Sequence, residues 1–153
     1  MTHTYMDSPI GGLRIHVTDE AVVAIDFDAR PGDDDQTSPV ATEAVRQLTE
    51  YFAGERATFE LPLAARGTPF QHQVWDQLVT IPHGSTVSYG EIAARLGLGP
   101  VASRAVGSAN GANPIPVVVP CHRVIGANGM LTGYAGGLDR KQRLLALEQP
   151  GLF

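Results

Sequence analysis

Alternating apolar and polar positions near the start of the chain predict a β-hairpin. Two runs of alternating apolar residues flank the turn-forming sequence at 18–20: Leu13, Ile15 and Val17 before it, and Val23, Ile25 and Phe27 after it. Such alternation is typical of antiparallel strands that bury one face. The chain therefore opens with an antiparallel sheet.

A helix and a further strand are predicted to follow the hairpin. Residues 31–39 are acidic and rich in turn formers, and apolar residues then recur at helical spacing: Ala41, Ala44, Val45, Leu48 and Phe52. Gly54 is expected to end this helix, because glycine readily adopts the left-handed conformation. The alternation of Phe59, Leu61 and Leu63 predicts one more strand. Together these patterns predict a small sheet backed by a helix.

The pattern changes at Gly67, where a helix start signal appears. Thr68 and Gln71 have the spacing of a capping box, and Pro69 occupies the first helical position, where a missing N–H is tolerated. The apolar face of this helix is predicted to join the core; it consists of Phe70, Val74, Trp75, Leu78 and Val79.

Two further helices are predicted around a glycine-containing turn. Ser88 and Glu91 form a second capping box that begins a helix through Leu96; the turn 97–100 ends it, and another helix follows over 101–110. This arrangement is either a helix-turn-helix that binds DNA or an αα-hairpin of the core, and on pattern alone the hairpin is the commoner structure. The second helix consists largely of Ala, Ser and Gly, which permit close approach to another backbone.

The single cysteine lies in an apolar stretch that contains three prolines, residues 113–124. We predict an extended run that brings Cys121 to a site whose backbone the prolines hold still. A lone cysteine is more often a small buried apolar residue. Here His122 and Arg123 follow it, and a nearby imidazole and cation favour the thiolate, which is the nucleophilic form. A glycine-rich loop, 126–137, and a closing helix over 139–148 complete the pattern.

Composition narrows the class of protein. The chain has 153 residues, 43% of them hydrophobic, which excludes a wholly disordered protein. No run of about 18 apolar residues is long enough to span a membrane, and the N-terminus lacks the features of a secretory signal. One cysteine cannot form an internal disulfide. We therefore expect a cytoplasmic protein.

The net charge of −5 is unevenly distributed. Residues 1–66 hold five Arg against twelve Asp and Glu, whereas residues 67–153 hold six basic residues against four acidic ones. A polyanion is therefore expected to bind the second half of the chain. A solvated loop that contains Asp33, Asp34 and Asp35 explains the difference equally well.

The motif around the cysteine resembles the active-site signature of the O6-alkylguanine-DNA alkyltransferases. The core of the match is Pro120-Cys121-His122-Arg123-Val124. It extends at the family's spacing to these residues: Asp7 to Gly11, Tyr51 to Gly54, Gly67 to Phe70, Val74, Trp75, Ser88 to Glu91, Arg104 to Gly107, Asn113, Pro114, Tyr134, Gly136, Gly137 and Glu148. The resemblance covers nearly the whole chain.

The resemblance implies an α+β fold and a repair activity. The expected domains are a ribonuclease-H-like α/β domain, residues 1–66, and a mostly helical, winged-helix-like domain with the helix-turn-helix and the active site, residues 67–153. The implied partner is double-stranded DNA that contains O6-alkylguanine, with O4-alkylthymine as a further candidate. The implied protein is a monomer that can cluster on DNA, acts once and needs no membrane.

The resemblance also implies roles for individual residues in the transfer. Cys121 is the alkyl acceptor, and His122 with Glu148 takes its proton through a bridging water. Tyr89 donates a proton to the leaving guanine, and Asn113 tethers the recognition helix to the active-site loop.

Further matched residues are implied to contact the DNA or the flipped base. Arg104 enters the base stack in place of the flipped nucleotide, on a helix that lies in the minor groove. Small residues beside it, Ala105, Gly107 and Ser108, allow close approach to the DNA. The walls and donors of the guanine pocket are Asn110, Val124, Tyr134 and Ala135.

Two departures from the family pattern concern the pocket, and one concerns metal binding. Ala135 replaces a serine, so its contact must come from the backbone amide, and Asn110 replaces a methionine. Some members hold a structural zinc with cysteines and histidines. One cysteine cannot build such a site, so we expect neither metal nor cofactor.

Two other classes of protein share parts of the pattern. A related group binds alkylated DNA without repairing it, but it lacks the acceptor cysteine. A cysteine hydrolase uses the same residue types, but it turns over many times and does not remain alkylated. The state of Cys121 after reaction distinguishes these alternatives.

Overall fold

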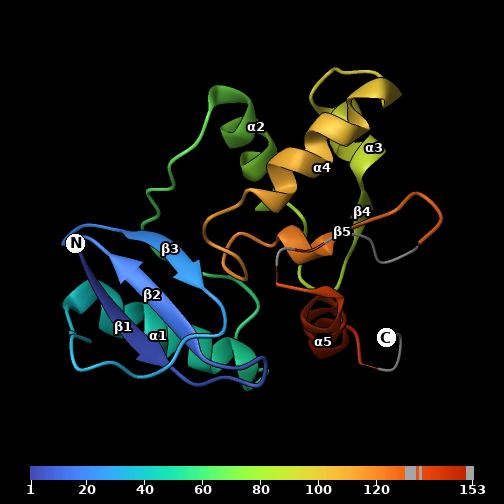
Figure 1. The fold of residues 1–153 in the computed structure, drawn as a ribbon. Helices are drawn as coiled ribbons and strands as arrows, with labels where there is room; N and C mark the ends of the chain where they lie inside the picture. Colours follow the sequence, from blue (N-terminus) through green and yellow to red (C-terminus); the bar gives the residue numbers. More distant parts are fainter. Residues whose placement is uncertain (130–133, 135, 151–153) are drawn as a thin grey trace. The chain divides into compact units, whose positions relative to one another are not determined.

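The structure is a computed structural model that describes residues 1–129, 134 and 136–150. The chain divides into two compact units, Met1–Arg66 and Gly67–Phe153, which are described separately (Figure 1). Within the described ranges, no helix is both long and apolar enough to cross a membrane.

The first unit is a three-stranded antiparallel sheet with one helix packed on it (Figure 1). The strands are β1 (Thr2–Met6), β2 (Leu13–Val17) and β3 (Val22–Asp26), in the order β1-β2-β3, and the helix is α1 (Pro39–Phe52). The predicted hairpin is confirmed as β2 and β3. The pattern did not predict β1, because a threonine, Thr4, takes one of its inward positions beside the apolar Met6.

The hydrophobic face of β3 differs from the prediction. A register irregularity at His16 and Val17 pairs Val17 with Val22, so Val22 is fully buried while Val23 is partly exposed. Ile25 is buried as expected, but Phe27 lies beyond the strand. A bulge changes which side chains face the core, and the alternation of residue types does not reveal it.

The predicted strand over 59–63 is wrong. Leu63 forms only an isolated parallel bridge with Val22, where Val22 N donates to Pro62 O (2.9 Å) and Ala64 N donates to Val22 O (2.9 Å). Pro62 has no N–H to extend the ladder. Leu63 is 38% exposed, so the alternating residues here do not form a buried face.

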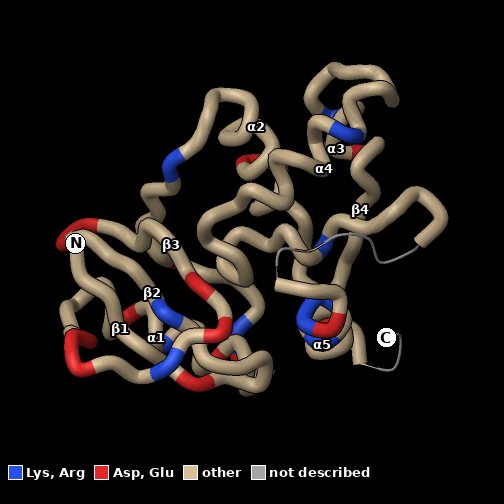
Figure 2. The backbone as a smooth tube through the Cα atoms, in the orientation of Figure 1, with Lys and Arg blue, Asp and Glu red and all other residues tan. Residues whose placement is uncertain are grey.

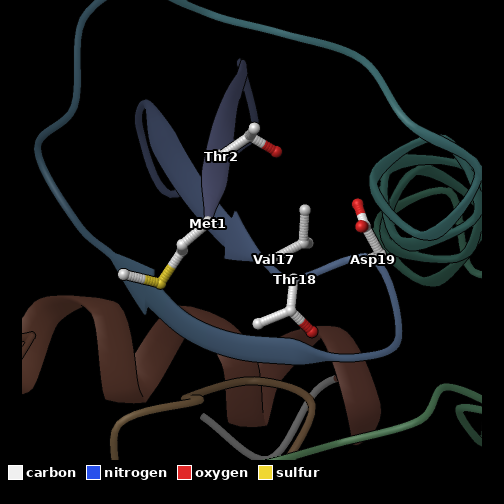
Figure 3. Close-up of a pocket in the computed structure, with 5 residues that line it drawn as sticks. All are labelled: Met1, Thr2, Val17, Thr18 and Asp19. Atoms are coloured by element: carbon white, nitrogen blue, oxygen red, sulfur yellow. The ribbon is translucent and has the colours of Figure 1, made fainter.

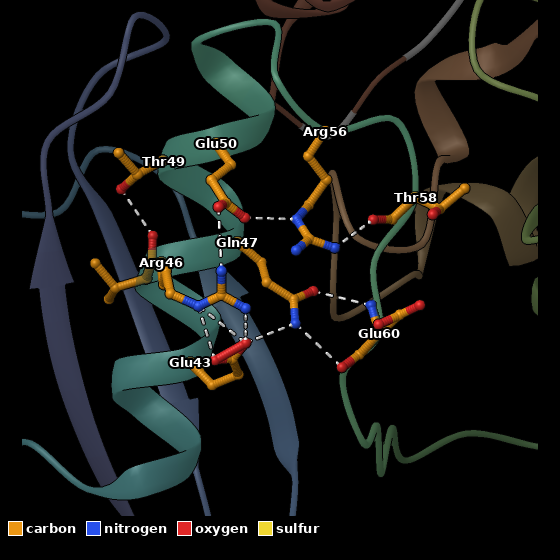
Figure 4. Close-up of polar contacts among 9 residues, drawn as sticks. Glu43, Arg46, Gln47, Thr49, Glu50, Arg56, Thr58 and Glu60 are labelled. Carbon is orange, nitrogen blue, oxygen red and sulfur yellow. Dashed lines mark hydrogen bonds and ion pairs between the residues drawn. The ribbon is translucent and has the colours of Figure 1, made fainter.

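The predicted end of α1 at Gly54 is confirmed, and its start is capped by a serine that the sequence pattern had not singled out. The Ser38 side chain accepts a hydrogen bond from Ala41 N (3.2 Å), and Gly54 follows the helix with φ of +77°. The exposed side carries ion pairs among Glu43, Arg46 and Glu50 (Figure 4). Hydrogen bonds from Arg46 lower the pKa of Glu43 to about 2.

A buried glutamine joins α1 to the segment after it. Gln47 is 2% exposed; its Nε2 donates to Glu60 O (3.2 Å), and its Oε1 accepts from Glu60 N (2.8 Å) (Figure 4). This pair of bonds gives residue 60 the partners that a neighbouring strand would otherwise supply.

The described part of the second unit consists of four short α-helices, two 3-10 turns and a two-stranded parallel sheet. Its elements in chain order are α2 (Pro69–Leu78), β4 (Val87–Ser88), α3 (Tyr89–Arg95), η1 (Pro100–Ala102), α4 (Ser103–Gly111), η2 (Cys121–Arg123), β5 (Val124–Ile125) and α5 (Leu138–Glu148). Both capping boxes form, at Thr68 and at Ser88. The two predicted helices around the glycine turn are confirmed, although the second begins with a 3-10 turn.

Helix α4 packs against both α2 and α3. On α2, Val74, Trp75 and Leu78 are buried as predicted, and Trp75 Nε1 donates to Ala109 O on α4 (2.8 Å). Val79 is 55% exposed, so its predicted place in the core is wrong; the helix ends at Leu78 and turns this side chain outward.

The run before Cys121 is not extended, contrary to the prediction. Residues 114–119 form bends and turns, Val119 N donates to Ile115 O (2.9 Å), and Val117 has φ of +72°. A β-branched residue rarely adopts this left-handed conformation, because its Cβ crowds the backbone. The packing around Val117 therefore holds a strained backbone conformation shortly before Cys121 in the chain.

The bond pair at Gln47 leads to the first prediction. Replacing Gln47 with Ala leaves the N–H and C=O of Glu60 without these partners, and we expect a loss of about 1–3 kcal/mol in the free energy of unfolding. Urea unfolding measures it. Thr42→Ala, at an exposed position of the same helix, is the control. Equal midpoints for both variants would contradict the structural role of Gln47.

Candidate active site

Cys121 lies at the start of a tight turn and is 4% exposed. Its N–H donates to Val119 O (2.8 Å), and Arg123 N donates to Pro120 O (3.0 Å), so the turn is closed by its own backbone. The chain leaves the turn as β5, which pairs with β4 in the register Val87 with Val124. This pairing brings the start of α3 beside the chain segment that follows the cysteine.

Two asparagines connect the end of α4 to the cysteine turn. Asn113 Nδ2 donates to Val119 O (2.8 Å), and Asn113 Oδ1 accepts from Ile115 N (3.0 Å). Asn110 Nδ2 donates to Cys121 O (3.2 Å), while within the described part of the chain no donor reaches its buried Oδ1. Asn113 was predicted to tether the recognition helix to this loop, and its two bonds have that geometry, whereas Asn110 was predicted in the pocket wall.

A buried carboxylate orients the imidazole next to the cysteine. His122 is fully buried, and its Nε2 lies 2.8 Å from Glu148 Oε2. Burial lowers the pKa of His122, and Glu148 offsets part of this shift. Since Glu148 binds one ring nitrogen, the other, Nδ1, is the atom that can exchange a proton. No hydrogen-bond partner for Nδ1 is present among the residues described.

Arg123 binds the same carboxylate, that of Glu148. Its Nε and Nη2 donate to the two oxygens of Glu148 (2.8 and 2.9 Å), and its Nη1 donates to Ile81 O (2.7 Å). Such a paired arginine fixes the carboxylate in place. The expectation that the guanidinium favours the Cys121 thiolate is therefore corrected: its donors are directed at Glu148 and Ile81.

Lys141 is a further charged group whose effect on the pKa of the thiol is smaller than the effects of burial, Asn113 and Tyr134. Burial raises the pKa of Cys121, while hydrogen bonds with Asn113 and Tyr134 and the charge of Lys141 act in the opposite direction. Lys141 is fully buried on α5, and its Nζ donates to Val124 O (2.6 Å). Sequence reasoning missed this residue. The available signal was that it is the only lysine among eleven basic residues and shares a helical face with Leu144, Leu145 and Glu148.

The predicted DNA-contacting residues lie mainly on the free face of α4. Arg104, Ala105 and Ser108 are exposed, whereas Val106 and Ala109 are buried. Gly107 lies against the ring of Tyr89: a Cβ at this position would meet ring carbons of Tyr89 at 3.7 Å. Figure 2 shows basic positions on α3 and α4. The free face of α4 therefore combines small side chains with one arginine.

The structure describes two of the three remaining residues that were predicted to line the guanine pocket. Val124 is fully buried in β5 and Tyr134 is partly buried, and the tyrosine hydrogen bond lowers the pKa of Cys121. Tyr89 is partly exposed at the start of α3. Ala135 lies outside the described residues.

Two features of the first unit do not belong to this site. A small pocket is lined by Met1, Thr2, Val17, Thr18 and Asp19 (Figure 3). Elsewhere in the described part of the unit, His3 Nε2 lies 3.4 Å from Asp34 and 3.7 Å from Asp35. These three residues have the composition of a metal site. Their contacts equally suit ion pairs that hold the acidic loop on β1, so we assign no metal.

Comparison with known proteins identifies the family. Residues 69–150 match the model of the 6-O-methylguanine DNA methyltransferase DNA binding domain, and residues 1–65 match that of its ribonuclease-like domain. These matches confirm the α+β fold and the resemblance of the cysteine motif.

Individual relatives agree with the family models over almost the full length of the chain. A methylated-DNA–protein-cysteine methyltransferase of Mycolicibacterium paratuberculosis is 54% identical over 94% of this chain and 90% of its own length. One from Methanosarcina acetivorans is 48% identical over 97% of this chain and 98% of its own. The crystal structure of Mycobacterium tuberculosis OGT in complex with DNA superposes with a TM-score of 0.89, at 46% identity over 97% of this chain and 93% of that one. The chain therefore belongs to the 6-O-methylguanine DNA methyltransferase family.

Proposed function

We propose that this protein repairs O6-alkylguanine in double-stranded DNA by moving the alkyl group irreversibly onto Cys121. The observation that carries the proposal is the buried cysteine turn, in which the thiol follows a strained backbone and precedes an imidazole fixed by Glu148. Membership of the family and the DNA complex of the Mycobacterium tuberculosis relative support DNA as the substrate.

Proton transfer precedes the attack. The thiol of Cys121 loses its proton to Nδ1 of His122 through a bridging water, because Nδ1 is the ring nitrogen that Glu148 does not bind. Glu148 then stabilises the cationic ring. The help is needed because burial raises the pKa of the thiol.

The transfer step exchanges one bond for another. The thiolate sulfur forms a bond to the alkyl carbon, the bond between that carbon and guanine O6 breaks, and the electron pair stays on the guanine. Tyr89 donates a proton to the guanine ring, so that the base leaves neutral. The product is a thioether, and since a thiolate is a poor leaving group from an unactivated alkyl carbon, Cys121 stays alkylated and each molecule acts once.

The target base must leave the duplex to reach a buried thiol. Arg104 lies exposed on α4 among small residues, and we assign it the place of the flipped nucleotide in the stack. Ala105, Gly107 and Ser108 allow the helix to approach the minor groove, and we assign Val124, Tyr134 and Asn110 to the walls of the base pocket; the further pocket residue that the resemblance implies, Ala135, lies outside the described residues. We further propose that the protein acts as a monomer in the cytoplasm, where the thiol stays reduced.

The state of Cys121 tests the proposed function. After incubation with duplex DNA that contains O6-methylguanine, intact-protein mass spectrometry should show a permanent gain of one methyl group on Cys121. Cys121→Ser should bind the same DNA without gaining mass. A wild-type thiol that stays unmodified in excess damaged DNA would favour binding or hydrolysis instead.

Base flipping predicts different losses on two substrates. Arg104→Ala should slow repair of duplex DNA by at least about tenfold, while reaction with the free O6-alkylguanine base stays close to wild type, because the free base needs no extrusion. Single-turnover rates measure both. Arg95→Ala, at an exposed position on α3, is the matched control. Equal losses of Arg104→Ala on the two substrates would exclude the role.

The neutral, buried His122 predicts a dependence of stability on pH. Its pKa is lowered in the folded protein, whereas in the unfolded chain it is about 6.5, so the unfolded state binds more protons below that value. The contribution of His122 to the free energy of unfolding is fully present above about pH 6.5, and it declines as the pH falls towards the pKa of His122 in the folded protein. The urea midpoint should therefore decrease as the pH falls. In the control variant His72→Asn it should decrease by the same amount per pH unit. A midpoint independent of pH would show that His122 is not held neutral.

A further inference from the structure

The mechanism above makes no use of Lys141, although this residue reaches the cysteine turn. Its side chain is fully buried, and its Nζ donates to Val124 O at 2.6 Å. Burial of an ammonium group is unfavourable unless it gains strong partners. The chain has ten arginines and this one lysine. The ammonium of a lysine is a compact charge, so burial concentrates that charge at one atom.

Helix α5 holds the cysteine turn with two opposite charges. Lys141 and Glu148 are seven residues apart, about two helical turns, so they lie on one face, together with buried Leu144 and Leu145. Glu148 binds His122 at the turn itself, whereas Lys141 binds the carbonyl of the residue that follows the turn. The negative end orients the proton acceptor, and the positive end is fixed on the carbonyl of Val124, three residues after Cys121.

The charges around the thiol indicate which groups stabilise the thiolate. Burial lowers the pKa of Lys141 to about 8, and the charge of Cys121 acts in the opposite direction. Burial raises the pKa of Cys121, whereas Asn113, Tyr134 and then the charge of Lys141 lower it. His122 and Arg123 are both directed at Glu148.

We propose that Lys141 is a positioning residue for alkyl transfer, whose buried ammonium, fixed on the carbonyl of Val124, stabilises the Cys121 thiolate. The inference rests on the proposed function, because the thiolate is the form that attacks the alkyl group. It explains why a buried cation is retained on the helix face that also carries Leu144, Leu145 and Glu148.

The test compares charge with hydrogen bonding at position 141. Lys141→Gln keeps an N–H donor for the carbonyl of Val124 but removes the charge, and Lys141→Arg keeps both. The probe is iodoacetamide, whose reaction with the single cysteine is followed by mass across a pH series. The midpoint of this profile should rise by about one pH unit in Lys141→Gln, which corresponds to an approximately tenfold slower reaction at neutral pH. Lys141→Arg should restore most of the difference.

Two controls separate a charge effect from a structural one. Arg143→Gln removes an exposed cation that pairs with Asp139 on the same helix, and its profile should match wild type. Lys141→Met matches the side-chain length without burying a polar group, so it carries the test if the glutamine variant unfolds. Neutral variants that react more slowly by the same factor at every pH, with an unmoved midpoint, would overturn the proposal.

A parallel measurement of methyl transfer from duplex DNA separates the two hypotheses. If wild type gains no methyl group, the proposed function fails, whatever the iodoacetamide profile shows. If wild type is methylated and the neutral variants keep its pH profile in both reactions, only the role of Lys141 fails. The expected result is methylation of wild type together with a displaced profile in both neutral variants.

Discussion

The carboxylate of Glu148 joins the catalytic candidates to the body of the second unit. One oxygen contacts both His122 and Arg123, the other binds Arg123 again, and Arg123 continues to the carbonyl of Ile81 after α2. When one member of such a buried network is removed, the charges of the others are left without a partner. This typically lowers the free energy of unfolding by about 3–5 kcal/mol. The network therefore fixes the imidazole and also ties α5 to the cysteine turn and the end of α2.

The site balances burial against reactivity. The Cys121 thiol is largely removed from water, but the same burial raises its pKa and disfavours the thiolate. Polar groups from three places offset that cost: Asn113 after α4, Tyr134 in the glycine-rich loop, and Lys141 on α5. A nucleophile that is used once has no need of fast turnover, so such a protected arrangement suits the proposed reaction.

The helix that we propose for DNA contact is coupled to the acceptor by direct bonds. Asn110 binds the carbonyl of Cys121, and Asn113 binds the carbonyl of Val119 two residues before the cysteine. On its other side, α4 is held by Trp75 through the carbonyl of Ala109. Movement of α4 on DNA would therefore act on the backbone of the cysteine turn, and added bulk at the sulfur would act on α4.

The sequence by itself determined the family, the main helices with their capping boxes, the β2–β3 hairpin and the cysteine motif, because these depend on residues close together in the chain. Only the tertiary structure decided the bulge beside Val17, the isolated bridge at Leu63 and the left-handed turn at Val117, since pairing partners and packing set those conformations. It also directed Arg123 to Glu148 and bound Lys141 to the carbonyl of Val124. The charge on a thiol depends on which groups share its burial, and those groups are brought together by folding from separate parts of the chain.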